Sequence, residues 1–211
     1  MTDYANEVAN DLLEIGAVKF SPEAPFTWAS GIKSPIYTDN RMTIGFPKVR
    51  ENTYCGLTEL IKASYPDVEI IGGVATAGIP HAAWVADQLK KPMIYVRSKP
   101  KDHGAGCQTE GANVTNHKVV LIDDLISTGG SVLAAAKAVE KEGGNVLGIV
   151  SIFSYELLAG VKNFESANLT FKSLTTYSQL MALAVSRGDL AADQIETLNE
   201  WKKQPEKWQA N

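Results

Sequence analysis

The sequence of 211 residues has only two cysteines, Cys55 and Cys107, and no CxxC pair. So few thiols argue against a disulfide framework and against a thiolate metal site, and they fit a reducing compartment. Apolar runs such as 119–122 are far shorter than the roughly 20 residues that span a bilayer. Lys and Arg total 20 against 24 Asp and Glu, so the net charge is −4 and the basic excess typical of nucleic-acid binding is absent.

Two common nucleotide-binding motifs are also missing, because the chain has neither GxxxxGK[ST] nor GxGxxG. Apolar residues make up 45% and charged residues 21%, which is ordinary for a globular protein with a sizeable core. Residues 1–7 are acidic and polar, unlike a signal peptide. We therefore expect a cytoplasmic protein with no membrane and no nucleic-acid partner.

Short apolar runs alternate with amphipathic segments along most of the chain. Strands are expected over 68–74, 93–96, 119–122 and 146–153, with a short one near 169–174. Helices are expected over 3–16, 47–64, 79–89, 131–142, 177–187 and 190–202. This alternation predicts a single α/β domain over 1–211, with a parallel sheet covered by helices on both faces. The core is expected over about 46–175. A small hood is expected from about 1–45, which proline and glycine break into short pieces, plus the C-terminal end.

Segment 97–118 interrupts the alternation, because it contains three glycines and a proline but few large apolar residues. Long segments of this kind in a compact domain are usually functional or disordered. Arg97, Lys101 and His103 are among its basic residues. One interpretation is a solvated surface loop. The other is a mobile cationic lid, about residues 98–117, that covers an anionic ligand and excludes water.

The stretch 119–131 joins an apolar strand to two carboxylates, two hydroxyls, two glycines and a third hydroxyl, directly before a helix. Ligands bind at the carboxyl edge of open α/β sheets. Glycines allow close backbone approach, and unpaired amides at a helix N-terminus bind phosphate. The carboxylates suit ribose hydroxyls or a divalent cation carried by the ligand. The pattern predicts a ribose 5-phosphate site. The alternative is an acidic turn with Ser131 as a helix N-cap.

Three segments resemble known families. Stretch 119–131 resembles the phosphoribosyl pyrophosphate (PRPP) signature of type I phosphoribosyltransferases. Segment 25–37 resembles the F-T-x-x-S-G-x-x-S-P pattern of orotate phosphoribosyltransferases, and 95–104 resembles the catalytic lid of that family. The likeness covers about residues 3–203.

The resemblance implies the type I phosphoribosyltransferase fold, with a five-stranded parallel sheet, helices on both sides and an N-terminal hood. It implies transfer of the 5-phosphoribosyl group from PRPP to orotate, giving orotidine 5′-monophosphate and pyrophosphate in pyrimidine biosynthesis. It also implies Mg²⁺ and a homodimer in which the lid of one subunit covers the active site of the other.

The implied catalytic residues are Arg97, Lys101 and His103, which would meet charge on the departing pyrophosphate. The implied PRPP-binding residues are Arg97, Lys101, His103, Asp123, Asp124, Leu125, Ile126, Ser127, Thr128, Gly129, Gly130 and Ser131. Asp123 and Asp124 would hold ribose hydroxyls, and Mg²⁺ would be carried by PRPP near them without direct protein ligands. Ser127 matches the position that contacts orotate in the family. The glycine-rich segment 72–78 would lie against the pyrophosphate, or is merely a tight strand–helix turn.

Several cations common in the family are absent at Ala29, Ala77, Ser98 and Ser154. Because orotate is anionic, another cation should balance its carboxylate. Lys33 and Arg41 are the candidates in the hood, although each could instead be a solvated surface cation.

Two alternative functions stay open at this point. One is a phosphoribosyltransferase for another base, such as uracil or a purine. The other is a non-catalytic PRPP sensor that regulates nucleic acid. Segment 25–37 and the lid argue against the first alternative, and the acidic balance argues against the second. His81 is expected as polar surface at a helix start. The tryptophans are expected to pack in the core, with Trp28 as the possible exception.

Overall fold

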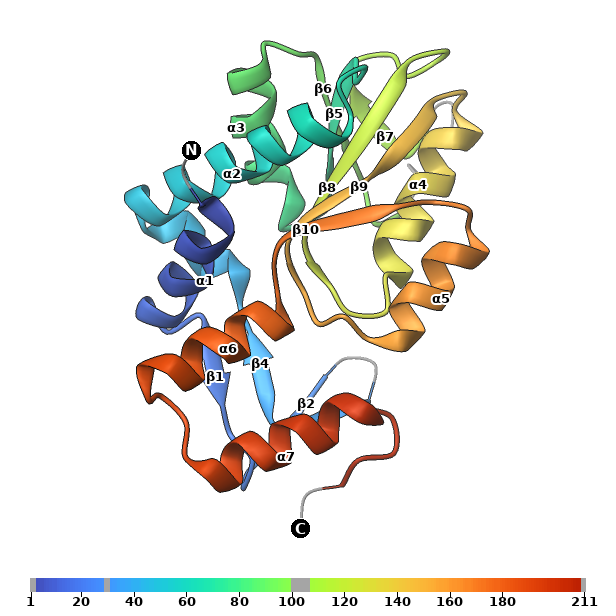
Figure 1. Ribbon diagram of the computed structural model, residues 1–211. Helices are drawn as coiled ribbons and strands as arrows, with labels where there is room; N and C mark the ends of the chain where they lie inside the picture. Colours follow the sequence, from blue (N-terminus) through green and yellow to red (C-terminus); the bar gives the residue numbers. More distant parts are fainter. Residues whose placement is uncertain (1–2, 29–30, 100–106, 210–211) are drawn as a thin grey trace.

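A six-stranded sheet forms the centre of the protein in the computed structural model, which describes residues 3–28, 31–99 and 107–209 (Figure 1). The strands are β5 (Ile70–Val74), β6 (Met93–Val96), β7 (Thr109–Gly111), β8 (Lys118–Ile126), β9 (Asn145–Ser154) and β10 (Phe171–Thr176). Their order is β10-β9-β8-β5-β6-β7. The first five run parallel, as expected, and β7 pairs antiparallel with β6 at the edge. The sheet is therefore mixed rather than wholly parallel, and its extra strand comes from the predicted lid.

Helices cover both faces of this sheet (Figure 1). Alternate residues of β8 enter two different hydrophobic clusters. Val120 and Ile122 pack in the cluster that includes residues of α2 (Pro47–Ser64) and α3 (Gly78–Leu89). Val119 and Leu121 pack in the cluster that includes residues of α4 (Gly130–Lys141). Because both faces are buried, this strand is apolar without alternation, which is why its sequence is so easily recognised.

The helices agree with the predicted ranges, with one omission. Besides α2, α3 and α4, the predicted helices are α1 (Tyr4–Glu14), α6 (Tyr177–Arg187) and α7 (Ala192–Lys203). The omission is α5 (Leu158–Ser166), which the sequence did not predict. Leu158 is 67% exposed and Val161 36%, so apolar residues on its outer side blur the helical pattern. None of the helices in the described ranges is long and apolar enough to cross a membrane.

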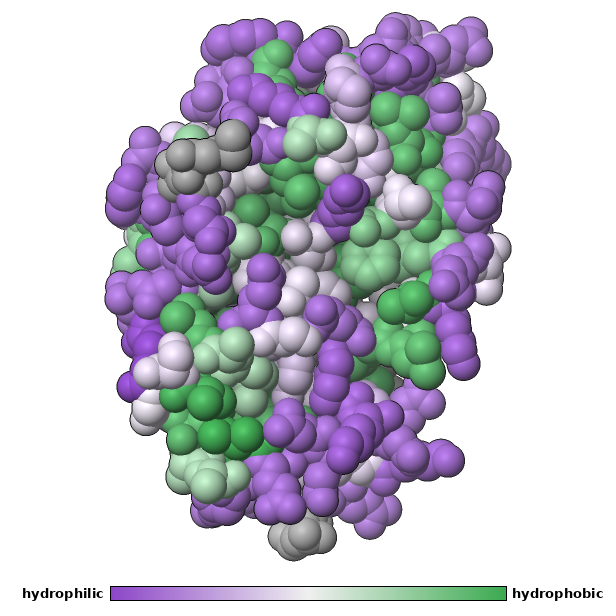
Figure 2. All heavy atoms as spheres, viewed as in Figure 1, coloured by the Kyte–Doolittle hydropathy of each residue, from purple (hydrophilic) through white to green (hydrophobic). Residues whose placement is uncertain are grey.

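The visible face of the molecule is mostly hydrophilic, with hydrophobic groups around α5 and in the lower left, near α6 (Figure 2). The described residues up to 45 and the last two helices gather on one side of the sheet domain, where α1 packs on α2 and β10 and α6 also contacts β10 (Figure 1). They contain β1 (Val18–Phe20) paired with β4 (Ile36–Thr38), β2 (Phe26–Thr27) paired with β3 (Lys33–Ser34), and the 3₁₀ helix η1 (Asn40–Gly45).

Two hydrogen bonds tie the hood together and to the core. The indole Nε1 of Trp201 in α7 donates to the carbonyl of Lys33 at 2.9 Å. The Thr38 amide donates to the Tyr155 hydroxyl at 3.0 Å, which joins β4 to the residue after β9. These contacts link segments far apart in the sequence, so the hood depends on tertiary partners.

Strand β5 ends at Val74, as does the strand expected over 68–74, and β8 extends beyond the expected 119–122. Gly72 and Gly73 lie inside β5, so the glycine-rich turn predicted over 72–78 is wrong for them. A Cβ at Gly72 would lie 2.5 Å from Leu121 Cδ2, so this glycine serves packing between strands. Strand β8 likewise continues through Asp123 and Asp124 to Ile126. The acidic pair is therefore held by the sheet rather than by a loop.

Candidate active site

A cleft of about 840 Å³ opens where the hood meets the carboxyl ends of the central strands. One wall comes from the end of β8 and the segment after it, through Asp123, Asp124, Leu125, Ser127 and Ser131. Tyr37, Asp39 and Arg41 of the hood face it, and Ala75, Thr76, Ala77 and Tyr155 contribute from neighbouring strand ends. The parallel strands bring these short segments to one edge, which is where open α/β sheets bind ligands.

The two acidic residues are close together and largely withdrawn from water. Asp123 is 7% exposed, and its Oδ1 accepts a hydrogen bond from the Asp124 amide at 2.9 Å. Burial raises the pKa of both carboxyl groups, and the neighbouring charge of Asp124 raises the pKa of Asp123 further. The side-chain amide of buried Asn40 donates a hydrogen bond to the Asp124 backbone carbonyl at 2.7 Å, which holds the end of β8 in place. A hydroxyl donor or a cation bound at the site would therefore stabilise the ionised form of this pair.

The turn after β8 leaves the start of α4 open. Gly129 is the N-cap of α4 at φ +78°, and no side chain caps this helix within the described part of the chain. The interpretation of Ser131 as N-cap is therefore wrong, because α4 begins one residue earlier, at Gly130. Free amides at such a helix end, with the helix dipole, favour a bound phosphate. The hydroxyls of Ser127 and Ser131 line the same cleft.

Helix α5 supports this turn from behind. The Asn163 side chain donates to the Thr128 carbonyl at 2.9 Å. A Cβ at Gly129 would lie 2.5 Å from Phe164 Cε2, and one at Gly160 would lie 2.5 Å from the Ser127 carbonyl oxygen. Glycine is required at Gly129 by both its positive φ and this close approach.

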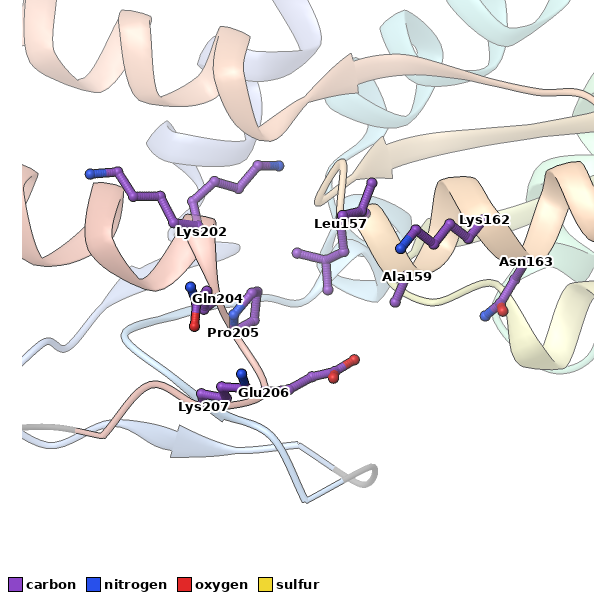
Figure 3. Close-up of a pocket in the computed structure, with 11 residues that line it drawn as sticks. Leu157, Ala159, Lys162, Asn163, Lys202, Gln204, Pro205, Glu206 and Lys207 are labelled. Atoms are coloured by element: carbon purple, nitrogen blue, oxygen red, sulfur yellow. The ribbon is translucent and has the colours of Figure 1, made fainter.

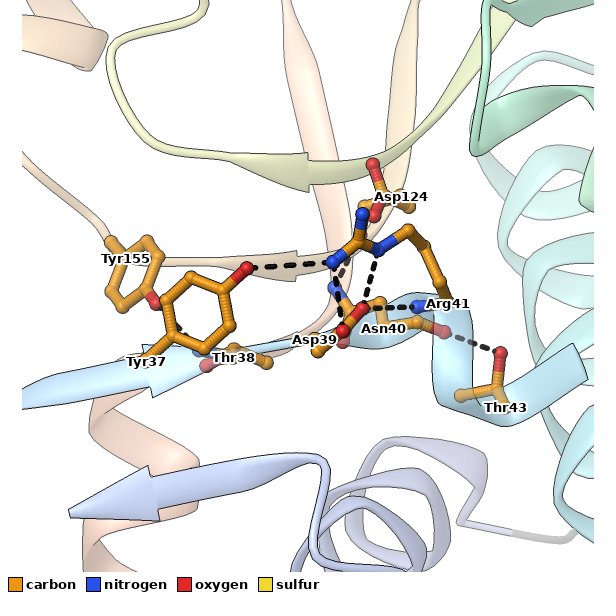
Figure 4. Close-up of polar contacts among 8 residues, drawn as sticks. All are labelled: Tyr37, Thr38, Asp39, Asn40, Arg41, Thr43, Asp124 and Tyr155. Carbon is orange, nitrogen blue, oxygen red and sulfur yellow. Dashed lines mark hydrogen bonds and ion pairs between the residues drawn. The ribbon is translucent and has the colours of Figure 1, made fainter. Parts of the chain in front are cut away.

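Arg41 is held beside the acidic pair by a bidentate ion pair (Figure 4). Its Nε and Nη2 donate to the two carboxylate oxygens of Asp39 at 2.6 and 2.8 Å, and Nη2 lies 3.5 Å from the Tyr37 hydroxyl. Hydrogen bonding to Asp39 raises the pKa of Arg41, and the same hydrogen bond lowers the pKa of Asp39. The positive charge of Arg41 also acts to lower the pKa of Asp124. Arg41 is therefore an oriented cation in the cleft wall.

The other predicted residues lie in different places. Ile126 is buried in the core, and Thr128, Gly129 and Gly130 form the turn without lining the cleft. Lys33 does not line the cleft either, and its Nζ donates to Thr27 Oγ1 at 2.7 Å.

Of the predicted cationic residues in segment 97–118, Arg97 directly follows β6, its Nη1 lies 3.9 Å from a Glu110 carboxylate oxygen, and it does not line the cleft. Lys101 and His103 lie outside the described residues, as does Ala29. Ser154 is buried behind the wall, and its hydroxyl accepts a hydrogen bond from the Glu156 amide at 3.0 Å.

The sequence analysis missed Tyr155 as a component of the cleft. Tyr155 directly follows β9, whose end pairs with the end of β8, so its place at the edge could have been inferred from strand order. Its ring packs 4.5 Å from that of Trp28 and 6.0 Å from that of Trp201, measured between centroids. Trp28 both packs in this aromatic cluster and lines the cleft.

His81 is buried rather than on the surface, so the sequence expectation for it is wrong. It lies one turn into α3, which packs on β5 and β8, and its ring meets that of Trp84 edge-on at 5.5 Å. Neither ring nitrogen has a hydrogen-bond partner within the described residues. Burial lowers the pKa of His81 to about 4.

A second cavity, of about 420 Å³, lies between α5 and the C-terminal end of α7 (Figure 3). Its lining includes Lys162, Lys202, Lys203 and Lys207, and none of the predicted site residues. Lys202 donates a hydrogen bond to the carbonyl of Tyr155, so this region supports the cleft wall from outside.

The fold and the paired acids before an open helix N-terminus define the class of protein as a phosphoribosyltransferase. A family model described as "Phosphoribosyl transferase domain" matches residues 54–164. Orotate phosphoribosyltransferase of Enterococcus faecalis is 54% identical over 99% of both chains, and that of Levilactobacillus brevis is 57% identical over 97% of both. The chain belongs to the orotate phosphoribosyltransferase family.

Solved structures share the fold. The orotate phosphoribosyltransferase of Aeropyrum pernix has a TM-score of 0.71 and 25% identity, covering 87% of this chain and 99% of that one. Leishmania donovani UMP synthase has a TM-score of 0.82 and 24% identity, covering 95% of this chain and 42% of that longer one.

Proposed function

We propose that this chain catalyses the Mg²⁺-dependent transfer of the 5-phosphoribosyl group from PRPP to orotate, giving orotidine 5′-monophosphate and pyrophosphate. The observation that carries the proposal is one cleft wall on which Asp123 and Asp124 adjoin the uncapped start of α4. A diol site beside a phosphate site is complementary to a ribose 5-phosphate. Family membership supports orotate as the acceptor.

In this proposal the 5′-phosphate lies against the turn 127–131, from which Ser127 and Ser131 line the cleft, and the acidic pair accepts hydrogen bonds from the ribose hydroxyls. Within residues 3–28, 31–99 and 107–209, no group of three or more His, Cys, Asp or Glu side chains could hold a metal ion. Two buried carboxylates with raised pKa values nevertheless fit a divalent cation that enters with its phosphate ligand. Such an ion would neutralise charge on the pyrophosphate.

The reaction breaks the bond between ribose C1 and pyrophosphate and forms one between C1 and a pyrimidine nitrogen, which gives up its proton to the leaving pyrophosphate or to water. Positive charge develops at C1 and negative charge on the leaving pyrophosphate. Arg97, Lys101 and His103 of the lid would stabilise the negative charge. Ala75, Thr76 and Ala77 line the cleft where their backbone could approach the same group.

For orotate, Arg41 is the better candidate of the two hood cations, because it lines the cleft and Lys33 does not. Ser127 lies in the same cleft. Replacing Arg41 by Ala should raise the KM for orotate about 10-fold or more, since a hydrogen bond to a charged group contributes roughly 1.5–3 kcal/mol. Lys33→Ala is the matched control. An unchanged KM for orotate in Arg41→Ala would remove Arg41 from the proposal.

We also propose a cytoplasmic homodimer with sites shared between subunits, as the family resemblance implies. Each subunit would be a single domain. Its hood, formed by about residues 1–45 and the C-terminal end, would cover the core of about residues 46–175.

The decisive experiment follows the loss of orotate absorbance with PRPP and Mg²⁺. Turnover should need all three components and should fall at least about 100-fold in Lys101→Ala, because one preorganised group contributes roughly 10²–10³ in rate. Lys90→Ala, an exposed change at the C-cap of α3, should behave as the unmodified protein. No turnover with orotate, together with pyrophosphate release with another base, would overturn the substrate assignment.

A further inference from the structure

The two chain segments that bracket the lid are fastened to each other. The Arg97 amide donates to the Gln108 carbonyl at 2.9 Å, and the Gln108 side chain donates to the Arg97 carbonyl at 2.6 Å. Beyond this point Thr109–Gly111 continues as β7 against β6. The two described ends of the lid therefore meet beside the ends of β6 and β7, where these hydrogen bonds hold them together.

Glu142, directly after α4, fastens the returning end to that helix. Its Oε1 accepts hydrogen bonds from the Gln108 amide at 2.6 Å and the Thr109 amide at 3.2 Å. Its Oε2 accepts a third, short hydrogen bond from the Thr109 hydroxyl. The Glu142 carbonyl also accepts from Thr115 Oγ1 at 3.3 Å. One side chain thus satisfies two backbone donors and a hydroxyl at the base of the lid.

The charge state of Glu142 suits this role. Burial alone would raise its pKa, but the hydrogen bonds from Thr109 and Gln108 outweigh it, and the pKa lies below its ordinary value. The carboxylate is therefore ionised at neutral pH, and hydrogen bonds to an ionised acceptor are stronger than neutral ones.

Helix α4 has this anchor at one end and the phosphate turn at the other. The helix has 12 residues, which corresponds to a length of about 18 Å. Gly129 stands at its N-terminus and Glu142 at its C-cap. One rigid element thereby spans from the turn after β8 to the base of the lid. The hydrogen bonds of Glu142 therefore join the start of β7 to the end of this helix.

We propose that Glu142 is a positioning residue that sets the base of the lid relative to the phosphate turn. The proposal rests on the function proposed above for the lid. It predicts an effect mainly on kcat, because the lid groups act on charge that develops as pyrophosphate departs.

The test compares Glu142→Ala, which removes all three hydrogen bonds, with Glu142→Gln, whose amide oxygen and nitrogen can replace them. Glu140→Ala is the matched control, because it removes the same charge from an exposed position on the same helix. Thr109→Val removes the hydroxyl bond alone and serves if Glu142→Ala does not fold. Each variant is assayed for kcat, for KM of PRPP, and for hydrogen exchange at the Gln108 and Thr109 amides.

We expect kcat in Glu142→Ala to fall about 10-fold or more, since small misplacements of catalytic groups can reduce rates up to about 100-fold. The KM for PRPP should change less than kcat, the two amides should exchange faster, and Glu142→Gln should recover most of the activity. A kcat in Glu142→Ala equal to that of Glu140→Ala, or unchanged amide exchange, would overturn the proposal. If the unmodified protein consumes no orotate, the proposed function fails, and amide exchange alone then decides whether Glu142 anchors the lid.

Discussion

Protonation of His81 should weaken the fold in mild acid. The unfolded chain takes up a proton as the pH falls through 6.5, but the buried ring resists protonation until about pH 4. Stability contributed by neutral His81 is therefore complete above pH 6.5 and is lost between these two values. Multiplying the difference between 6.5 and 4 by about 1.36 kcal/mol gives a total loss of about 3.4 kcal/mol, of which about 2 kcal/mol is lost by pH 5.

The perturbation is His81→Phe, which keeps an aromatic ring against Trp84 and removes the ionisable group. Urea unfolding at pH 7.5 and pH 5.0, at one protein concentration, yields the free energy of unfolding at each pH. The loss on acidification should be about 2 kcal/mol smaller in His81→Phe than in the unmodified protein. His117→Asn, at an exposed histidine, is the control and should leave the loss unchanged. Equal losses in His81→Phe and the unmodified protein would refute the reasoning.

Three further results are expected. Asp124→Asn should reduce kcat/KM about 100-fold or more in the orotate assay, because the proposed ribose site then loses one of its two carboxylates. Gly129→Ala should lower the free energy of unfolding by roughly 1–3 kcal/mol, because the added Cβ would clash with Phe164 and the residue has a positive φ. Gly130→Ala, whose added Cβ would meet open space, should leave the free energy of unfolding nearly unchanged. Thermal unfolding of the two variants measures the difference. If sites are shared in a homodimer, mixing inactive Lys101→Ala and Asp124→Asn subunits should restore about one quarter of full activity, because half of the dimers then hold one intact site. No recovery after subunit exchange would argue for sites built within one subunit.

Local sequence pattern predicted much of the α/β framework. Pro47 opens α2 and Gly188 follows α6, so the ends of these helices are encoded by residues that start or stop any helix. The apolar run of β8 identified a strand buried on both faces. The acids and glycines after that run were enough to predict a ribose phosphate site, because phosphate and diol recognition depend on neighbouring residues.

The remaining features depend on contacts between distant segments. Strands β2 and β3 have two residues each and form through mutual pairing, and α5 exposes Leu158, so neither had a clear local pattern. His81 is polar by type, and only the packing of α3 on the sheet removes it from water. The ion pair of Arg41 with Asp39 is local, but only the packing of the hood against the strand ends brings Arg41 to the cleft, whereas Lys33 lies outside it and donates to Thr27. Residue type and spacing along the chain thus determined most of the strands and helices and the turn after β8, but tertiary packing decided which charges are buried and which line the cleft.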